Sequence, residues 1–257
     1  MGRGFGIAAS VAPEVAATVA QEAERLGYTS FWSNDTGGFD GLATLAAAAG
    51  ATTTLKLGVG VIGVDRRPGN SIADDVARLG LPLERLWLGV GSGGSRSLAI
   101  VRQAVDDLHQ RGITTAFIAA LGPNMNRLAG EVAEGVLFNW LTPEFAERSR
   151  GWVLEAAERV GRPHPIISAY VRCALLPQAD AQLDRQAALY SSFPSYADHF
   201  TRMGVSARNT CVHGPDAATL QAGIARHEAV LDETVVRAIT ADESAESILE
   251  LLHACAP

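Results

Sequence analysis

The chain has 257 residues, 47% of them hydrophobic, which is enough to bury a sizeable core, and a formal net charge of −7. This acidic balance argues against a role in binding nucleic acid or anionic membranes, and no apolar run reaches the roughly 18 residues of a membrane span. Three cysteines far apart in sequence, with no CxxC motif, argue against a disulfide framework and favour a cytoplasmic location.

Short apolar segments alternate with amphipathic helical segments along the whole chain, which is typical of a parallel α/β fold. Strands are expected over residues 5–8, 29–32, 55–61, 86–90, 115–119, 136–139, 166–174 and 235–239. Helices are expected from about residues 13, 40 and 215, and over 71–79, 97–111, 124–132, 143–160, 179–203 (interrupted near Pro194) and 246–254.

Eight strands separated by helices favour a closed (β/α)8 TIM barrel, because an open doubly wound sheet usually has about six strands. Helix boundaries carry the expected signals: Pro13 suits a first helical turn, Asp40 can cap the next helix, and Gly27 and Gly50 suit helix ends. No linker or low-complexity segment interrupts the chain. The sequence therefore predicts one barrel domain over residues 1–257.

Glycines recur on the third and fourth strands. The alternation of side chains along a strand predicts that Gly58, Gly60, Gly89 and Gly91 point into the barrel, while leucines and valines pack outward on the helices. Barrel interiors usually hold bulky branched residues. These glycines leave room for a flat ring to approach the backbone, although relief of crowding or a β-bulge explains them equally well.

Two glycine-containing turns are candidates for phosphate binding. The run from Gly89 to Gly94 lacks the acidic residue that a dinucleotide-binding fold places at the end of the next strand, so that interpretation is rejected. The segment Leu121-Gly122-Pro123-Asn124-Met125-Asn126-Arg127 follows a strand and opens a helix, where backbone N–H groups favour an anion. An ordinary strand-to-helix turn is the alternative for this segment.

Taken together, several segments resemble the luciferase-like monooxygenase family. They are Glu24–Trp32 with Asn34 and Asp35, then the stretches 51–61 and 83–93, and the stretch 121–143 with Leu-Gly-Pro-Asn-Met and Ala-Glu-Gly-Val-Leu-Phe-Asn-Trp-Leu-Thr-Pro. The last stretch is most similar to the branch that uses the deazaflavin coenzyme F420. The similarity covers most of the chain up to about Gly161.

This resemblance implies a barrel, often dimeric, that holds a cofactor above the strand ends. The cofactor would be coenzyme F420, with FMN as the alternative. Its ring would lie near Gly58, Gly60, Val61, Gly89 and Gly91, and its phosphate would meet the backbone of Gly122, Pro123, Asn124 and Met125. The family often has an unusual peptide bond at the end of the third strand, here the stretch 61–63.

Two features depart from the family pattern. Thr36 follows Asp35 where many relatives have histidine, and the stretch between Gly93 and Gly122 lacks the usual insertion. The shortened stretch predicts an open site, a different lid or a loss of activity.

The candidate residues for polar contact with ring or substrate are Asn34 and Asp35, with helix capping as the alternative. Asn139 is a candidate contact to the phosphate or ring of the cofactor, with hydrogen bonding within its own turn as the alternative. Trp32 and Trp140 are candidate pocket walls, but buried core aromatics are commoner. Arg66 and Arg67 could meet a cofactor tail, although a solvated loop is the simpler expectation.

Other chemistries find little support in the sequence. The six histidines form no metal-binding pattern, and a catalytic role for His199 has weak support. The serines near residue 191 lack a GxSxG context, and Lys56, the only lysine, has no special setting for an aldolase.

The sequence thus predicts an oxidoreductase that transfers hydride between F420 or FMN and a small organic substrate, in a cytoplasmic homodimer. A cofactor-binding barrel without turnover is the alternative.

Overall fold

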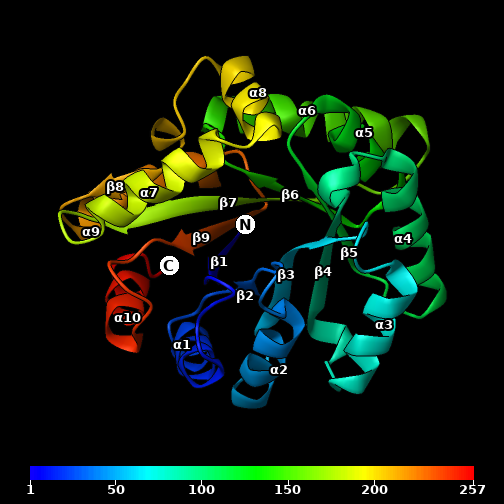
Figure 1. Cartoon of the computed structure of the whole chain (residues 1–257). Coiled ribbons are helices and arrows are strands. Elements are labelled where there is room, and N and C mark those ends of the chain that lie inside the picture. Colours follow the sequence, from blue (N-terminus) through cyan, green and yellow to red (C-terminus); the bar gives the residue numbers. More distant parts are fainter.

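A computed structural model describes residues 1–257 as a closed barrel of eight parallel strands surrounded by helices (Figure 1). Each barrel strand pairs with its sequence neighbour, and β9 closes the ring between β7 and β1. The strands are β1 (Gly2–Gly6), β2 (Ser30–Ser33), β3 (Lys56–Gly63), β4 (Leu86–Gly91), β5 (Ala116–Ala120), β6 (Gly135–Asn139), β7 (Ile166–Leu175), β8 (Val212–Gly214) and β9 (Glu233–Ala238). The predicted TIM barrel is confirmed.

Ten α-helices accompany the strands, and the short strand β8 lies outside the ring, paired with the end of β7. The helices are α1 (Pro13–Arg25), α2 (Gly41–Ala51), α3 (Gly69–Arg78), α4 (Leu98–Gln110), α5 (Pro123–Val132), α6 (Pro143–Arg159), α7 (Asp180–Ser191), α8 (Pro194–Met203), α9 (Ala217–Glu228) and α10 (Ala245–Ala254). The expected break near Pro194 is the boundary between α7 and α8.

The local signals act as expected at several helix ends. Pro13 opens α1, and Gly27 after it has a φ of +87°, which glycine adopts without strain. The carboxylate of Asp40 accepts the Leu42 N–H at 3.0 Å and caps α2. These contacts fix where the two helices begin and end.

Two element boundaries and one short strand differ from the sequence expectation. The first strand begins at Gly2 because Arg3 points outward and bonds to Glu228 on α9 and to the carbonyls of Cys255 and Ala256 near the C-terminus. A pattern of alternating apolar residues does not reveal the start of this strand, because an arginine occupies one of its positions. Strand β8 was not predicted, since three residues carry no periodicity. Helix α3 begins two residues early, at Gly69, whose Cα packs against α4.

The longest connection between two barrel strands lies between β7 and β9. Only a short turn and α4 lie between β4 and β5. Instead, α7 and α8 are inserted between β7 and β8; α7 packs against β7, and α8 follows it at the edge of the same barrel end (Figure 1). We refer to α7 and α8 as the lid; which of the three expectations raised by the shortened stretch applies stays a prediction.

Candidate active site

Aromatic side chains fill the lower barrel. Trp32, Phe117, Leu137, Tyr170 and Val235 form one buried cluster inside the ring of strands. The Trp32 ring lies 5.8 Å from the Phe117 ring and 6.0 Å from the Tyr170 ring, both edge-on. Such contacts add to the burial of apolar area. This plug closes the barrel, so that any ligand must lie above it, at the carboxyl ends of the strands.

Two of the predicted glycines serve this plug. Gly58 faces the interior, as predicted, but the Trp32 indole lies directly against it and a Cβ there would overlap the ring. At Gly89 a Cβ would lie 2.5 Å from the carbonyl oxygen of Gly60 and closer still to that of Val59. Gly58 and Gly89 therefore make room for protein atoms below the barrel mouth, and Trp32 belongs to the core.

The other two glycines lie at the mouth. The register between β3 and β4 shifts between Val59 and Ile62, and this irregularity sets Gly60 against the Tyr170 hydroxyl and the Asn34 amide. Gly91 and the half-buried Ala119 continue the wall on β4 and β5, beside the Val61 side chain. The chain has no cis peptide bond between residues 61 and 63; the bulge is the unusual feature there.

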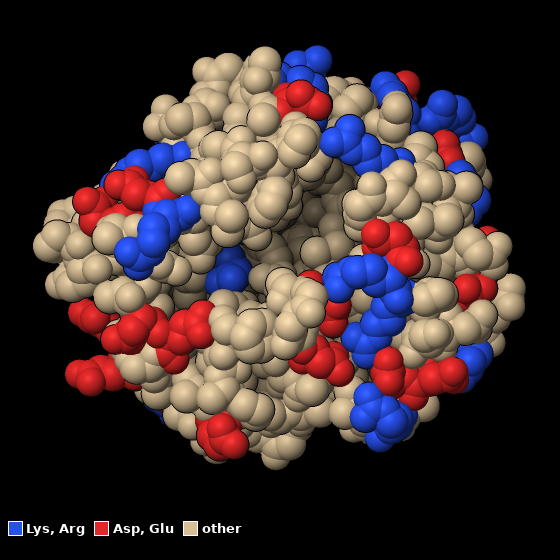
Figure 2. All heavy atoms as spheres, in the orientation of Figure 1, with Lys and Arg blue, Asp and Glu red and all other residues tan.

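Polar side chains occupy the opposite half of the mouth. Asn139 at the end of β6 accepts a hydrogen bond from Arg172 Nη1 at 2.6 Å and donates one to the Tyr196 hydroxyl at 3.0 Å. Arg172 and Arg237 stand on the neighbouring strands β7 and β9. Figure 2 shows a hollow near the middle of this face, bordered mainly by uncharged residues, with a basic group at its edge.

Sequence reasoning missed Tyr170, Arg172 and Arg237. A period of two was available as a signal, because Ser168, Tyr170 and Arg172 alternate with apolar residues along β7. On β9, Arg237 likewise follows two residues after Val235, an interior position of that strand. A polar residue in phase with the interior positions of a strand is a candidate for the barrel mouth.

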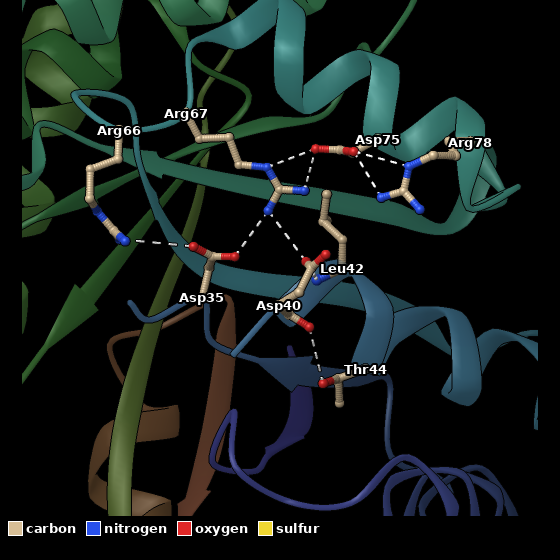
Figure 3. A network of polar contacts seen from close by, with 8 residues as sticks. All are labelled: Asp35, Asp40, Leu42, Thr44, Arg66, Arg67, Asp75 and Arg78. Carbon is tan, nitrogen blue, oxygen red and sulfur yellow. Dashed lines mark hydrogen bonds and ion pairs between the residues drawn. The ribbon is translucent and has the colours of Figure 1, made fainter. Parts of the chain in front are cut away.

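Asn34 and Asp35 follow β2 but have different surroundings. The Asn34 amide oxygen lies over Gly60 inside the mouth. Asp35 Oδ2 instead accepts a hydrogen bond from Arg67 Nη1 at 3.0 Å, and Asp35 Oδ1 lies 3.9 Å from Arg66 Nη2 (Figure 3). Burial raises the pKa of Asp35 while the Arg67 charge opposes that rise. Asn34 is thus the better placed of the two to touch a ligand.

Arg67 is the centre of an ion-pair network that joins the loops after β2 and β3 to α3 (Figure 3). Its guanidinium binds Asp35, Asp40 and Asp75, the last at 2.6 Å. Arg66, by contrast, is 54% exposed, as expected for a solvated loop. Arg67 is held by these three carboxylates, so that its role is to hold the loops in place.

Replacing Arg67 with methionine should lower the free energy of unfolding by about 1–2 kcal/mol, because three carboxylates lose their common partner in a half-buried site. Arg78→Met is the matched control. It removes the other partner of Asp75 from an exposed position and should change stability by less than about 0.5 kcal/mol. Urea unfolding of both variants measures the difference; equal effects would contradict a special role for Arg67.

The N-terminus of α5 is the predicted phosphate-binding turn. No side chain caps this helix, and Asn124 and Met125 lie in its first turn, where backbone N–H groups have no partner within the helix. Arg202 from α8 reaches the same turn and donates from Nη2 to the Leu121 carbonyl at 3.4 Å. Open N–H groups beside a guanidinium favour an anion such as a phosphate.

The lid formed by α7 and α8 has its own aromatic core. Trp140 is 1% exposed and packs against Tyr190 and Phe200, with ring centroids 4.9 and 5.9 Å away. His199 is also buried, and its Nε2 lies 2.9 Å from the Trp140 carbonyl oxygen. Burial lowers the pKa of His199 to about 4, so the ring is neutral at pH 7. His199 and Trp140 therefore hold the lid against β6.

No group of three histidine, cysteine or carboxylate side chains comes together to hold a metal ion. None of the helices combines the length and the apolar character needed to cross a bilayer.

Comparison with solved structures gives the same fold at low sequence identity. The coenzyme F420-dependent tetrahydromethanopterin reductase from Methanopyrus kandleri is 17% identical, with a TM-score of 0.74 over 100% of this chain and 98% of that chain. An F420-dependent secondary alcohol dehydrogenase bound to an F420–acetone adduct is 14% identical (98% of each chain, TM-score 0.73). A type II Baeyer–Villiger monooxygenase of Pseudomonas putida in complex with FMN is 13% identical (100% and 97%, TM-score 0.72).

Sequence comparison reaches the family but no individual relative. No curated protein gives a significant match to the chain. The profile of the luciferase-like monooxygenase family matches residues 3–116 and 99–256, which together span nearly the whole chain. With the barrel and its mouth, this match shows that the chain belongs to the luciferase-like monooxygenase family.

Proposed function

We propose that the protein is an oxidoreductase that transfers hydride between coenzyme F420 and a small organic substrate, with FMN as the alternative cofactor. The observation that carries the proposal is the asymmetric mouth: small residues on β3, β4 and β5 face polar side chains that follow β2 or lie on β6, β7 and β9. A flat ring can approach glycine backbone closely, and the polar half is left for the substrate. The F420- and FMN-dependent neighbours support this assignment.

The residues present fit such a cofactor. The ring would lie against Gly60, Val61 and Gly91, above the plug, and its phosphate would meet the α5 N-terminus, where Arg202 adds positive charge. Asn139 borders the same space, although its amide already binds Arg172 and Tyr196. Gly58 and Gly89 act one layer lower, by admitting Trp32 and by letting β3 and β4 approach.

When bound, F420 or FMN supplies a ring atom that accepts or donates hydride, and the protein positions and shields it. Asn34 lies at the rim of the plug, with its amide oxygen over Gly60. It can donate to a carbonyl oxygen or accept from a hydroxyl group of the substrate. Tyr170, whose hydroxyl donates to the Ser33 carbonyl at 3.0 Å, fixes the floor beneath it, and the α7–α8 lid limits the entry of water.

Titration with F420 and with FMN, followed by fluorescence, tests the proposal. We expect saturable binding of one of them, followed by its oxidation or reduction in the presence of substrates from a panel of alcohols, ketones and imines. Failure of both cofactors to bind would overturn the proposal. The missing insertion after β4 favours one alternative, a cofactor-binding barrel without turnover, and binding with no turnover across the panel would support it.

Enlarging a wall residue should block the cofactor without unfolding the protein. Ala119→Leu places three extra carbon atoms in the mouth from a half-buried position on β5, and we expect the dissociation constant to rise by roughly tenfold or more. Ala225→Leu, at an exposed position on α9, is the control and should leave binding unchanged. Unaltered affinity in Ala119→Leu would place the ring elsewhere.

A homodimer and a cytoplasmic location remain predictions.

A further inference from the structure

Two buried arginines stand side by side at the mouth. Arg172 on β7 and Arg237 on β9 are 3% and 6% exposed, and they are direct neighbours in the parallel pairing of the two strands. Adjacent strands lie about 4.8 Å apart, so that two positive charges are held close together. Burial, together with the neighbouring Arg172 charge, lowers the pKa of Arg237.

Neither arginine has a carboxylate partner. Arg172 donates to the Asn139 amide oxygen, and Arg237 donates to its neighbouring Ala238 carbonyl at 2.8 Å. The Nε atoms of both are buried without a hydrogen-bond partner. Glu243, in the exposed loop after β9, is the acidic side chain that acts on Arg237, but it makes no ion pair with it and accepts a hydrogen bond from Ser10.

Two other arginines with low exposure do have carboxylate partners. Arg3, with a similar 9% exposure, binds Glu228 at 2.7 Å, and Arg67 binds three carboxylates. A buried charge is strongly unfavourable unless it is paired and hydrogen-bonded. Arg172 and Arg237, at the mouth, therefore differ from Arg3 and Arg67 in that they lack a carboxylate partner.

The guanidinium of Arg172 is also held rigidly. Its Cζ lies 3.7 Å from the centroid of the Trp140 ring and 4.8 Å from that of Tyr190. Trp140 adopts a φ of +53°, a left-handed conformation that is strained for a bulky residue. The lid thus fixes the direction of a cation whose remaining donors have no partner in the protein.

We infer that Arg172 and Arg237 together bind the anionic group of the substrate, a carboxylate or another oxyanion. The assignment of this anion to a substrate rests on the proposed function, whereas the existence of the anion site does not. Planar guanidinium groups match the oxygens of a carboxylate or phosphate, and a bound oxyanion would neutralise the adjacent charges. In the proposed function, the ring of the cofactor lies against the small residues of β3, β4 and β5, and its phosphate lies at the N-terminus of α5. Both positions are on the other side of the mouth from the two arginines.

The first test uses the full chain without added cofactor. Trp140 stacks on Arg172, so tryptophan fluorescence should respond to titration with acetate, benzoate and inorganic phosphate, and the melting temperature should rise with each anion that binds. Acetamide, benzamide and sodium chloride at the same ionic strength are the controls. No saturable response to any of the oxyanions, or an equal response to the neutral amides, would overturn the inference.

Variants assign the response to the two side chains. Arg237→Met and Arg172→Lys should each weaken anion binding at least tenfold, while Arg159→Gln, an exposed arginine at the end of α6, should leave it unchanged. In anion-free buffer Arg237→Met should be at least as stable as the parent protein, because it removes an unpaired buried charge. Anion binding that survives in Arg237→Met and Arg172→Lys would place the site elsewhere.

A competition experiment separates substrate from cofactor phosphate as the source of the anion. If the pair serves the substrate, benzoate binds equally well with the cofactor at saturation, and Arg237→Met leaves the dissociation constant of FMN or F420 unchanged. Displacement of benzoate by FMN but not by riboflavin would assign the pair to the cofactor phosphate and overturn the substrate assignment. If no cofactor binds, the proposed function fails, while the titrations without cofactor still decide the anion site.

Discussion

Gly89→Ala should lower the free energy of unfolding by about 3 kcal/mol. The added Cβ would lie 2.5 Å from the Gly60 carbonyl oxygen and closer to that of Val59. These are backbone atoms of the neighbouring strand β3, and no side-chain rotation can relieve the overlap. The two strands would have to separate at the bulge, where the barrel wall turns toward the mouth.

Two other glycines provide the comparison for Gly89→Ala. Gly60→Ala meets the Tyr170 hydroxyl and the Asn34 amide, which are side-chain atoms that can shift, so a smaller loss of stability is expected. Gly151→Ala, inside α6 with open space around it, should raise stability by up to about 1 kcal/mol. Urea unfolding of the three variants gives the order. A Gly89→Ala protein as stable as Gly60→Ala would show that β3 and β4 can separate without much loss of free energy.

The same glycines show how far the sequence could be interpreted. Alternation along β3 and β4 correctly predicts which residues face inward, because the pleat fixes that from local pattern alone. What fills the space beside each glycine depends on residues distant in sequence. Gly58 is matched by Trp32 and Gly60 by Tyr170, a residue more than a hundred positions away. Packing partners of this kind have no local signal.

Some residues of the candidate site can likewise be predicted from local sequence, and others depend on distant parts of the chain. Asn34 and the turn at Gly122 could be proposed from sequence, since each directly follows a strand. The difference between Asn34 and its neighbour Asp35 could not, because it depends on Arg67 arriving from another loop. Arg172 and Arg237 become a pair only when β9 closes the barrel beside β7. Closure thus creates a site that no single segment encodes.

Acidification between pH 6.5 and pH 4 should destabilise the folded protein through His199 and His227. Burial is the main cause that lowers the pKa of each to about 4, whereas an imidazole in the unfolded chain titrates near 6.5. In this window the unfolded chain binds more protons than the folded one, so stability falls as the pH falls. At about 1.4 kcal/mol per pKa unit, each histidine contributes up to about 3 kcal/mol that is fully present above pH 6.5.

Variants of the two histidines isolate this effect from carboxylates that also titrate. Glu24 has a pKa lowered to about 2, so its contribution is lost only below about pH 4.5, while the raised pKa of Glu233 acts in the opposite direction. Urea unfolding at several pH values between 7.5 and 4.5 should show a flatter slope in His227→Gln and His199→Gln, with the exposed His164→Gln as control. Because His199 bonds to the Trp140 carbonyl, its protonation should first free the lid, and tryptophan fluorescence should change before the barrel unfolds. Slopes that match the parent protein in both variants would mean that other groups govern the acid response.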